Sequence, residues 1–461
     1  MYSLKELLES KNIAVVGASR NPLKPGSILM KLLKDTGFKG QVAGVNREGG
    51  EIYGIPFYHS LDDIPFNVEL AVMIIPPKAV VSCAADCVRN GVKGIVISSE
   101  GFAEAGSEGS QYQQEIRTIL ESSGMRGFGP NTMGIVNTAT GLTTAYFATE
   151  KELRPGAVGF AGQSGIFVGA LLRYVSSFKE LRISKGIGLG NKIDIDESDV
   201  LEFFEQDEQT EIVGMYLEDV KDGRRFLEAA RRASAKKPVL LLKGGRTSAG
   251  ARATASHTAS MAVDDAVFNG AITQAGVVRM GGVEELIGTL MGFRCMPLPK
   301  GNKIAFITFS GAQAIMSIDA ATDEGLGLAR FAKDTKEKMA KVIATPSKAH
   351  NPVDIYPDML AHGFEKTTVE ILRAMLDDDG VNGIIFISFS SSDNKAYLPI
   401  VEVIQERKKK PVFISLLGDR ESGETNRVFL EDHRIPCYPF PETAVRVFSN
   451  MWKYAQNVRK R

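Results

Sequence analysis

The sequence predicts an α/β protein in which parallel β-sheets are covered by helices. Two observations lead to this prediction. Short runs of apolar, β-branched residues alternate with amphipathic stretches along the whole chain, and this alternation is typical of parallel sheets with helical connections. The chain also has 461 residues, which is enough for about three domains and too long for one hydrophobic core.

The first predicted elements are a helix and a series of buried strands. Ser3 and Glu6 form a capping-box pattern, which predicts a helix start near the N-terminus. An apolar run at 12–16 predicts a buried strand that ends at Gly17. Further runs of this kind predict strands at 42–45, 70–75 and 94–97.

Two segments have the composition of linkers. The first, at 150–156, is charged and contains proline and glycine, and the second, at 295–302, is rich in the same two residues. They predict three domains, at 1–149, 150–297 and 300–461. Each of these ranges has an ordinary domain size.

Charge and composition exclude some classes of function. The 55 Lys and Arg residues balance the 55 Asp and Glu residues, so no overall positive field is available to hold nucleic acid or an acidic membrane. No run of about 18 apolar residues predicts a membrane span, and charges among the first leucines argue against a signal peptide. The four cysteines are too few for a disulfide framework, which favours a reducing compartment, the cytoplasm. The sequence predicts no metal site.

Two segments share the order strand, Ser-Gly turn, helix. Ser164 and Gly165 follow one apolar run, and Ser310 and Gly311 follow another. A helix that starts directly after a buried strand presents free N–H groups and its positive dipole end, which suits an anion such as phosphate. The alternative is that each serine is an ordinary helix N-cap. Two copies strengthen the case for anion binding without excluding the N-cap alternative, because two helix ends can hold one phosphoryl group from two sides.

The turn after the first strand has no dinucleotide fingerprint. The segment from Gly17 to Gly26 lacks the GxGxxG spacing that places a pyrophosphate on a helix start. The second strand ends at Asn46 and Arg47, where an NAD-binding fold has an acidic residue for the ribose. Arg47 can instead pair with a ribose phosphate, as in NADP or coenzyme A, or be a surface arginine without a ligand. The sequence has no P-loop either.

His257 lies in a segment of unusual composition. Most residues from 247 to 260 are small, and His257 is the one imidazole among them. Such a segment predicts a mobile loop, with the next helix starting at about residue 263. A neutral imidazole can attack a phosphoryl group and store it as phosphohistidine, and a loop can then carry that group between sites. The alternative is a histidine that forms hydrogen bonds at a helix start.

Glu218 is the candidate partner of His257. It follows the buried run at 212–217, and ligands and catalytic groups gather at the carboxyl ends of parallel strands. A carboxylate that binds one ring nitrogen fixes the tautomer and leaves the other nitrogen free to attack. Glu218 can also be a solvated loop residue before a helix that Asp222 caps.

A set of short motifs occurs in a fixed order along the chain: Val16–Ser19, Lys24–Gly26, Val45–Arg47, Ile97–Phe102, Gly129–Asn131, Gly162–Gly165, Tyr216–Glu218, Ser256–Thr258, Phe309–Gly311 and Asn351–Asp354. Together they closely resemble the α subunit of the NDP-forming acyl-CoA synthetases. This is the ADP-forming acetyl-CoA synthetase group of the succinyl-CoA synthetase superfamily. The resemblance extends over essentially all 461 residues.

The resemblance implies a fold and a set of site residues. It implies a Rossmann-like CoA-binding domain followed by two flavodoxin-like domains of the succinyl-CoA synthetase type. It implies that His257 is phosphorylated, that Glu218 supports it, and that the two Ser-Gly turns hold the phosphoryl group. It assigns coenzyme A to residues in the turns of the first domain: Gly17, Ala18, Ser19, Arg20, Lys24, Pro25, Asn46, Arg47, Pro76, Ser99, Glu100, Gly101 and Asn131.

The resemblance also implies a reaction and a partner. Acyl-CoA and phosphate give acyl phosphate and free CoA, the phosphoryl group moves to His257, and it then moves to ADP. In reverse, the same steps activate a carboxylic acid. Fused members of the family carry an additional ATP-grasp domain, for which three α/β domains leave no room in this sequence. We therefore expect Mg-ADP or Mg-ATP to bind to a separate ATP-grasp β subunit, in an α2β2 assembly.

Three of the motifs depart from the family pattern. Arg47 and Glu48 stand where proline and lysine are usual. Glu100 stands where alanine is usual, and Thr132 where cysteine is usual. The change at 47–48 affects which cation binds the CoA phosphates. The change at Thr132 affects the pocket beside the thioester.

Two other functions stay open on the residues alone. The chain can be a CoA or acyl-CoA sensor in which His257 is not phosphorylated. It can also be a dehydrogenase that uses NADP, which the missing glycines disfavour. The acyl group is not predicted, although Tyr146, Phe147, Asn191 and Lys192 are candidates to line its pocket.

Overall fold

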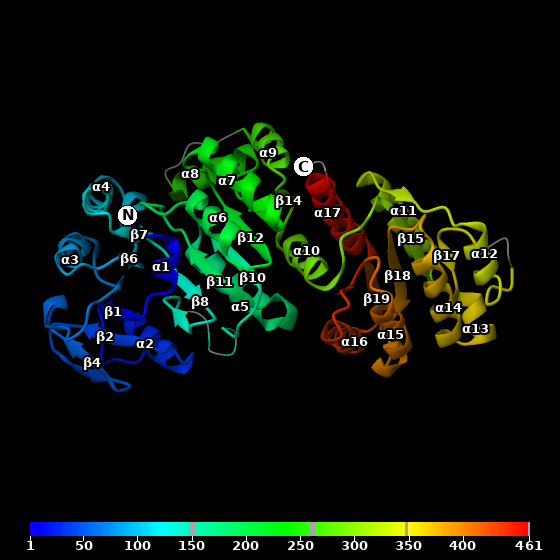
Figure 1. Cartoon of the computed structure of the whole chain (residues 1–461), viewed down its shortest axis with the longest axis horizontal. Coiled ribbons are helices and arrows are strands. Elements are labelled where there is room, and N and C mark those ends of the chain that lie inside the picture. Colours follow the sequence, from blue (N-terminus) through cyan, green and yellow to red (C-terminus); the bar gives the residue numbers. More distant parts are fainter. Residues whose placement is uncertain (147–148, 150, 152, 259–263, 346–348, 460–461) are drawn as a thin grey trace. The chain divides into compact units, whose positions relative to one another are not determined.

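The computed structural model describes residues 1–146, 149, 151, 153–258, 264–345 and 349–459, with the backbone alone at 166–168 and 254–258 (Figure 1). The described residues form two compact units, Met1–Met280 and Gly281–Arg461. Three β-sheets connected by helices build these units, so the predicted α/β class is confirmed.

The first sheet has the strand order β3-β4-β2-β1-β5-β6-β7, and its neighbours run parallel except for the β3–β4 pair. Its strands are β1 (Asn12–Val16), β2 (Gln41–Val45), β3 (Gly50–Ile52), β4 (Ile55–Tyr58), β5 (Leu70–Met73), β6 (Gly94–Ile97) and β7 (Arg126–Phe128). The helices between them are α1 (Leu4–Leu8), α2 (Pro25–Asp35), η1 (Leu61–Asp63), α3 (Pro77–Arg89), η2 (Ala103–Ala105) and α4 (Ser107–Ser123).

Local sequence explains these elements. The capping box at the start of α1 is present, with the Glu6 amide donating to the Ser3 hydroxyl at 3.3 Å and the Ser3 amide donating to the Glu6 carboxylate at 2.8 Å. Strand β1 is apolar from Ile13 onward because both of its faces are buried there, as in other parallel sheets. Strand β5 ends at Met73, two residues before the predicted end, and the chain then turns into α3, which starts at Pro77.

The second sheet has the strand order β14-β13-β12-β10-β11-β8-β9. Its strands are β8 (Ile135–Asn137), β9 (Leu142–Thr143), β10 (Val158–Gly162), β11 (Ile183–Gly188), β12 (Ile212–Leu217), β13 (Val239–Lys243) and β14 (Val278–Met280). Its helices are α5 (Gly165–Ser177), η3 (Lys179–Leu181), α6 (Glu197–Gln206), α7 (Gly223–Lys236), α8 (Ser248–Thr258) and α9 (Asp265–Gln274). The strands from β10 onward run parallel, and β8 and β9 join antiparallel at one edge.

The first two sheets belong to one compact unit, and a buried arginine connects them. The Arg126 guanidinium on β7 donates to Asp194 at 2.8 Å and to Asp199 at 3.2 Å. Strands β8 and β9 also lie before residue 149 in the sequence, yet they pair within the second sheet. The expected boundary at 149 stays a prediction, and residues 150 and 152 of the expected linker lie outside the described residues.

The third sheet has the strand order β16-β15-β18-β19-β20, with β17 paired to β15, and the described pairs are parallel. Its strands are β15 (Lys303–Thr308), β16 (Gly327–Leu328), β17 (Val353–Asp354), β18 (Gly383–Phe389), β19 (Val412–Leu417) and β20 (Cys437–Tyr438). Its helices are α10 (Val283–Cys295), α11 (Gly311–Asp323), α12 (Lys333–Met339), α13 (Tyr356–His362), α14 (Phe364–Asp377), η5 (Asn394–Tyr397), α15 (Leu398–Glu406), α16 (Arg420–Asp432) and α17 (Pro441–Arg459).

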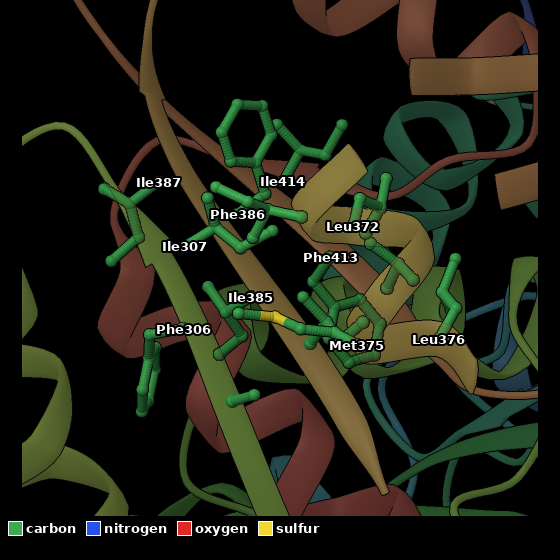
Figure 2. Close-up of a cluster of buried hydrophobic side chains, with 14 of the residues drawn as sticks. Phe306, Ile307, Leu372, Met375, Leu376, Ile385, Phe386, Ile387, Phe413 and Ile414 are labelled. Carbon is green, nitrogen blue, oxygen red and sulfur yellow. The ribbon is translucent and has the colours of Figure 1, made fainter. Parts of the chain in front are cut away.

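The core of the second unit lies between this sheet and its helices. Figure 2 shows Phe386 and Ile385 of β18 beside Phe413 of β19, with Leu372 and Met375 of α14 facing the strands. Helix α10 precedes the expected boundary at 297, but it packs against α17 in this unit. That boundary also stays a prediction.

None of the helices among the described residues combines the length and apolar character needed to cross a bilayer.

Candidate active site

The candidate CoA-binding residues follow five neighbouring strands of the first sheet. They lie in the turns after β1, β2, β5, β6 and β7, at the carboxyl edge of the sheet (Figure 1). Strand β1 lies between β2 and β5. The chain passes from β1 to β2 on one side, and the later strand β5 is added on the other side of β1. Such a switch point opens a crevice at the carboxyl edge, and this is where open α/β sheets bind ligands.

The turn after β1 brings backbone close to the start of α2. Gly17 has a φ of +96°, and a β-carbon at this position would lie 2.3 Å from the Ile74 carbonyl oxygen. A β-carbon on Gly26 would lie 2.7 Å from the Gly17 carbonyl oxygen. Lys24 precedes the helix and is exposed, and Pro25 occupies its first turn. The amides at the start of α2 therefore lie next to the turn, in the arrangement that binds phosphates in related folds.

Asn46 fastens the second turn to the first. Its side-chain amide donates to the Ala18 carbonyl at 2.7 Å, and its side-chain oxygen accepts from the Glu48 amide at 2.7 Å. The two candidate arginines of this region are exposed and differ in their contacts. Arg20 donates to Glu48 at 2.8 Å. Arg47 contributes its carbonyl to a hydrogen bond from His59, at 3.0 Å, while its side chain extends on the surface.

Ser99 joins the turns after β5 and β6. Its hydroxyl donates to the Ile75 carbonyl at 2.5 Å and accepts from the Ile75 amide at 3.1 Å. These two hydrogen bonds fix the main chain of Ile75, directly before the exposed Pro76. Glu100 is exposed, and its negative charge adds to burial in raising the pKa of the Tyr146 phenol. Tyr146 therefore lies within electrostatic range of this turn.

Gly101 begins a connection between the two sheets of this unit. It has a φ of +101°, and its amide donates to the Glu104 carboxylate at 2.8 Å. Burial alone would raise the pKa of Glu104, but hydrogen bonds from Asn191 and the main chain hold it below the usual value. Asn191, a candidate for the acyl pocket, donates to Glu104 at 2.6 Å. Its amide is thus engaged in fixing the turn after β6. Phe147, another pocket candidate, lies outside the described residues.

Asn131 brings the candidate CoA-binding edge next to the second sheet. It has a φ of +58°, and its amide donates to the Ser99 carbonyl at 2.9 Å. A β-carbon on Gly165 would lie 3.2 Å from the Met133 side chain and 3.9 Å from the Asn131 carbonyl oxygen. The start of α5 therefore packs directly against the turn after β7.

Ser164 and Glu218 occupy a second switch point. Strand β10 lies between β11 and β12, Ser164 caps α5 after β10, and Glu218 follows β12. Gln163 joins the two strand ends, because its side-chain oxygen accepts from the amides of Glu218 at 2.9 Å and Asp219 at 3.2 Å. Its side-chain nitrogen donates to the Asp219 carboxylate at 2.6 Å. The structure thus brings together two of the predicted site elements.

A buried charge cluster supports the segment after Glu218. The Lys192 ammonium donates to Glu197 at 2.9 Å and also bonds the Asp219 carboxylate. Burial alone would raise the pKa of Asp219, but Lys192 and Gln163 together hold it below the usual value. Lys192 is 2% exposed. This candidate for the acyl pocket is therefore satisfied by carboxylates of the protein itself.

The prediction of a loop around His257 is wrong for most of the segment. Residues Ser248–Thr258 form α8, and Thr247 caps it by accepting the Gly250 amide at 3.0 Å. Alternating alanines explain this helix, since alanine has the highest helix propensity. His257 lies in the last turn of α8, and its side chain lies outside the described residues, as do residues 259–263.

The backbone of α8 lies next to η2, which follows the turn containing Gly101. The helix that carries His257 is thus adjacent to the candidate CoA-binding edge. The next helix, α9, begins at Asp265 with Asp264 as its N-cap, two residues after the predicted start.

Ser310 and Gly311 form a helix start in the second compact unit. Ser310 caps α11, and its hydroxyl accepts from the Gln313 amide at 3.4 Å. Gly311 is exposed, and apart from the adjoining main chain no described atom lies within 4 Å of the place that its β-carbon would take. The predicted helix start is therefore present after β15, and its anion binding stays a prediction.

Sequence analysis missed the groups that hold Glu218. The Tyr216 hydroxyl donates to the Glu218 carboxylate at 3.1 Å, and the Lys243 ammonium donates to the Glu218 carbonyl at 2.6 Å. Tyr216 lies two residues before Glu218, and Gln163 directly precedes Ser164. Their places beside predicted site residues were therefore a signal that could have identified them. A separate cleft of about 1350 Å³ lies near the amino ends of β1, β2 and β12, and none of the predicted site residues lines it.

Sequence models of three protein families match successive parts of the chain. A CoA binding domain matches residues 11–138, a succinyl-CoA ligase like flavodoxin domain matches 155–293, and a ligase-CoA domain matches 304–460. Each matched range contains most or all of the strands of one of the three sheets.

Similar proteins match the chain over nearly its full length. Acetate–CoA ligase (ADP-forming) II of Archaeoglobus fulgidus is 36% identical over 455 residues, which cover 98% of this chain and 67% of the relative. The α subunit of acetate–CoA ligase (ADP-forming) I of Pyrococcus furiosus is 35% identical, with 98% of both chains covered.

A solved structure gives the same result. The dinucleotide forming acetyl-coenzyme A synthetase 1 of Ca. Korarchaeum cryptofilum, in complex with phosphate and ADP, matches with a TM-score of 0.91 and 31% identity. The match covers 100% of this chain and 99% of that one. The chain therefore belongs to the NDP-forming acyl-CoA synthetases and corresponds to their α subunit.

Proposed function

We propose that this chain catalyses the acyl-transfer and first phosphoryl-transfer steps of an ADP-forming acyl-CoA synthetase. The enzyme interconverts acyl-CoA, ADP and phosphate with a carboxylic acid, ATP and CoA. The observation that carries the proposal is the contact of Asn131 and Met133 with Gly165. It supports the proposal because the candidate CoA-binding edge lies beside the candidate phosphoryl-binding helix, where a thioester and a phosphate could meet.

In the first step, a phosphate oxygen attacks the thioester carbonyl, the C–S bond breaks, and CoA leaves as a thiolate that takes up a proton. The amides at the start of α5, beside Ser164 and Gly165, hold the phosphate and stabilise its negative charge. The turns that contain Gly17, Asn46 and Ser99 orient the CoA thioester. The products of this step are acyl phosphate and free CoA.

In the second step, a neutral nitrogen of His257 attacks the phosphoryl group. The P–O bond to the acyl group breaks, and the carboxylate leaves. Glu218 accepts the N–H of the other ring nitrogen, which fixes the tautomer and stabilises the positive charge that develops on the ring. In the second compact unit, Ser310 and Gly311 form another helix start whose amides can bind an anion.

The last step, transfer from His257 to ADP, requires a nucleotide site. We propose that an ATP-grasp β subunit supplies this site with its Mg²⁺, in an α2β2 assembly in the cytoplasm. Support comes from the P. furiosus relative, which is named as an α subunit and matches this chain along 98% of both lengths. No P-loop sequence occurs in the 461 residues.

The test is phosphorylation of the chain in the presence of acyl-CoA and labelled phosphate. The wild-type chain should acquire label that is labile in acid and stable in base, and His257→Ala should acquire none. His362→Ala is the matched control, because His362 is exposed on α13. Equal labelling of wild type and His257→Ala would contradict the proposal, and binding of acyl-CoA without any labelling would favour a sensor instead.

A further inference from the structure

Glu218 is held by contacts to three different parts of the residue. The Tyr216 hydroxyl donates to a carboxylate oxygen at 3.1 Å, Gln163 accepts the main-chain amide at 2.9 Å, and Lys243 donates to the main-chain carbonyl. These three residues come from β12, the end of β10 and the end of β13. Three neighbouring strands of the sheet thus converge on one glutamate.

The hydroxyl of Tyr216 is a permanent donor at physiological pH. Burial, together with the negative charge of Glu218, raises its pKa to about 12. The phenol therefore remains protonated when the carboxylate is ionised, and a hydrogen bond between a neutral hydroxyl and a carboxylate is charge-assisted. Such a bond restricts the carboxylate to one orientation.

Gly244 leaves room for this pair. A β-carbon at this position would lie 2.8 Å from the Tyr216 hydroxyl oxygen and 3.4 Å from the Glu218 side chain. Its amide donates to the Leu217 carbonyl at 2.8 Å, which fixes the end of β13 against the end of β12. The backbone therefore approaches so closely that any side chain larger than hydrogen would displace the Tyr216 hydroxyl.

We propose that Tyr216 is a positioning residue for Glu218, which it orients while Gln163 and Lys243 fix the backbone of that glutamate. This proposal rests on the proposed role of Glu218 at His257. A catalytic carboxylate needs to be held within a narrow range of orientations by residues around it. Tyr216 acts through Glu218 and does not itself touch the transferred phosphoryl group.

The kinetic test uses Tyr216→Phe in the full chain together with its nucleotide-binding partner. We expect kcat to fall about tenfold, which is the effect of removing one charge-assisted hydrogen bond. The KM for CoA should stay within about twofold, since the CoA-binding turns are unchanged. Tyr174→Phe is the matched control, because Tyr174 is 57% exposed on α5, and it should retain wild-type kcat.

A double variant separates positioning from a structural role. If Tyr216 acts through Glu218, then Tyr216→Phe should cause no further loss of kcat in a Glu218→Gln background. Equal kcat for Tyr216→Phe and wild type, or an undiminished tenfold loss in the Glu218→Gln background, would overturn the proposal. If Tyr216→Phe does not fold, Gly244→Ala displaces the same hydroxyl and should give the same loss.

Titration tests the contact without any turnover. The absorbance of ionised phenol, taken as the difference between wild type and Tyr216→Phe, gives the pKa of Tyr216. In Glu218→Gln this pKa should fall from about 12 toward 10. An unchanged value would overturn the proposal. If the wild-type chain is never phosphorylated, the proposed function fails, and this titration still decides whether Glu218 and Tyr216 are in contact.

Discussion

The side-chain oxygen of Gln163 lies 2.9 Å from the main-chain nitrogen of Glu218. Gln163 directly precedes the Ser-Gly start of α5, so one amide connects the candidate phosphate-binding helix to the candidate catalytic carboxylate. The same oxygen accepts the Asp219 amide at 3.2 Å, and Gln163 itself is 6% exposed. Its loss would leave two partly buried main-chain donors without their acceptor.

Gln163→Met should therefore lower the free energy of unfolding by about 2 kcal/mol, because it keeps the volume and removes the acceptor. Gln111→Met on the exposed face of α4 should change it by less than about 0.5 kcal/mol. Urea titration of both variants measures this difference. Equal stability of the two variants would show that the Gln163 bridge is not needed.

The ion pairs of Arg126 predict a second stability effect. Its side chain is 9% exposed, and its partners Asp194 and Asp199 are 20% and 13% exposed. Arg126→Met should lower the free energy of unfolding by about 3 kcal/mol, because Asp194, which is half-buried, loses its counter-charge and Asp199 keeps only that of Arg225. Arg232 is itself half-exposed, and its partner Glu205 also pairs with Lys236, so Arg232→Met should cost less than about 1 kcal/mol. Thermal unfolding that ranks the two variants in the opposite order would contradict this.

Asp219 predicts a pH dependence. Its pKa in the folded protein lies below 3.8, the ordinary value, because Lys192 outweighs the effect of burial. A depressed folded pKa contributes stability above pH 3.8, and this contribution is lost as the pH falls through the folded value. Asp219→Asn should therefore be less stable than wild type at pH 7, and the difference should shrink below about pH 4. A difference that is constant from pH 7 to pH 3 would contradict the ion pair.

Arg47 predicts an effect on ligand binding. If its exposed guanidinium binds the ribose phosphate of CoA, Arg47→Ala should weaken binding of CoA about tenfold and hardly change binding of 3′-dephospho-CoA. Arg89→Ala, also exposed but on α3, should bind both ligands as wild type does. Isothermal titration of the two ligands makes the comparison. A tenfold loss for both ligands would assign Arg47 to another part of CoA.

The strands of the parallel sheets could be predicted from sequence alone. The strands predicted at 12–16 and 94–97 have the same limits as β1 and β6, because a strand buried on both faces is apolar along almost its whole length. The pairing of β8 with β11 could not be predicted in this way. The two strands are antiparallel and far apart in sequence, so the local pattern of apolar residues does not predict that they pair.

The segment around His257 shows how two signals can conflict. Small residues suggested a loop, whereas the repeated alanines have high helix propensity, and the helix formed. At the site, the position of Glu218 after β12 followed from its place in the sequence. Its hydrogen bonds with Gln163, Tyr216 and Lys243 could not be predicted, because they depend on how three strands are ordered in the sheet.

The most direct test of the whole account is to locate the phosphoryl group after incubation of the wild-type chain with acyl-CoA and phosphate. Trypsin cleaves after Arg252 and Arg279, which releases a peptide whose one histidine is His257. Mass spectrometry under mildly basic conditions should find the phosphoryl group on His257 of this peptide. Phosphorylation at any other residue, or turnover of acyl-CoA with His257 unmodified at every time point, would contradict the account.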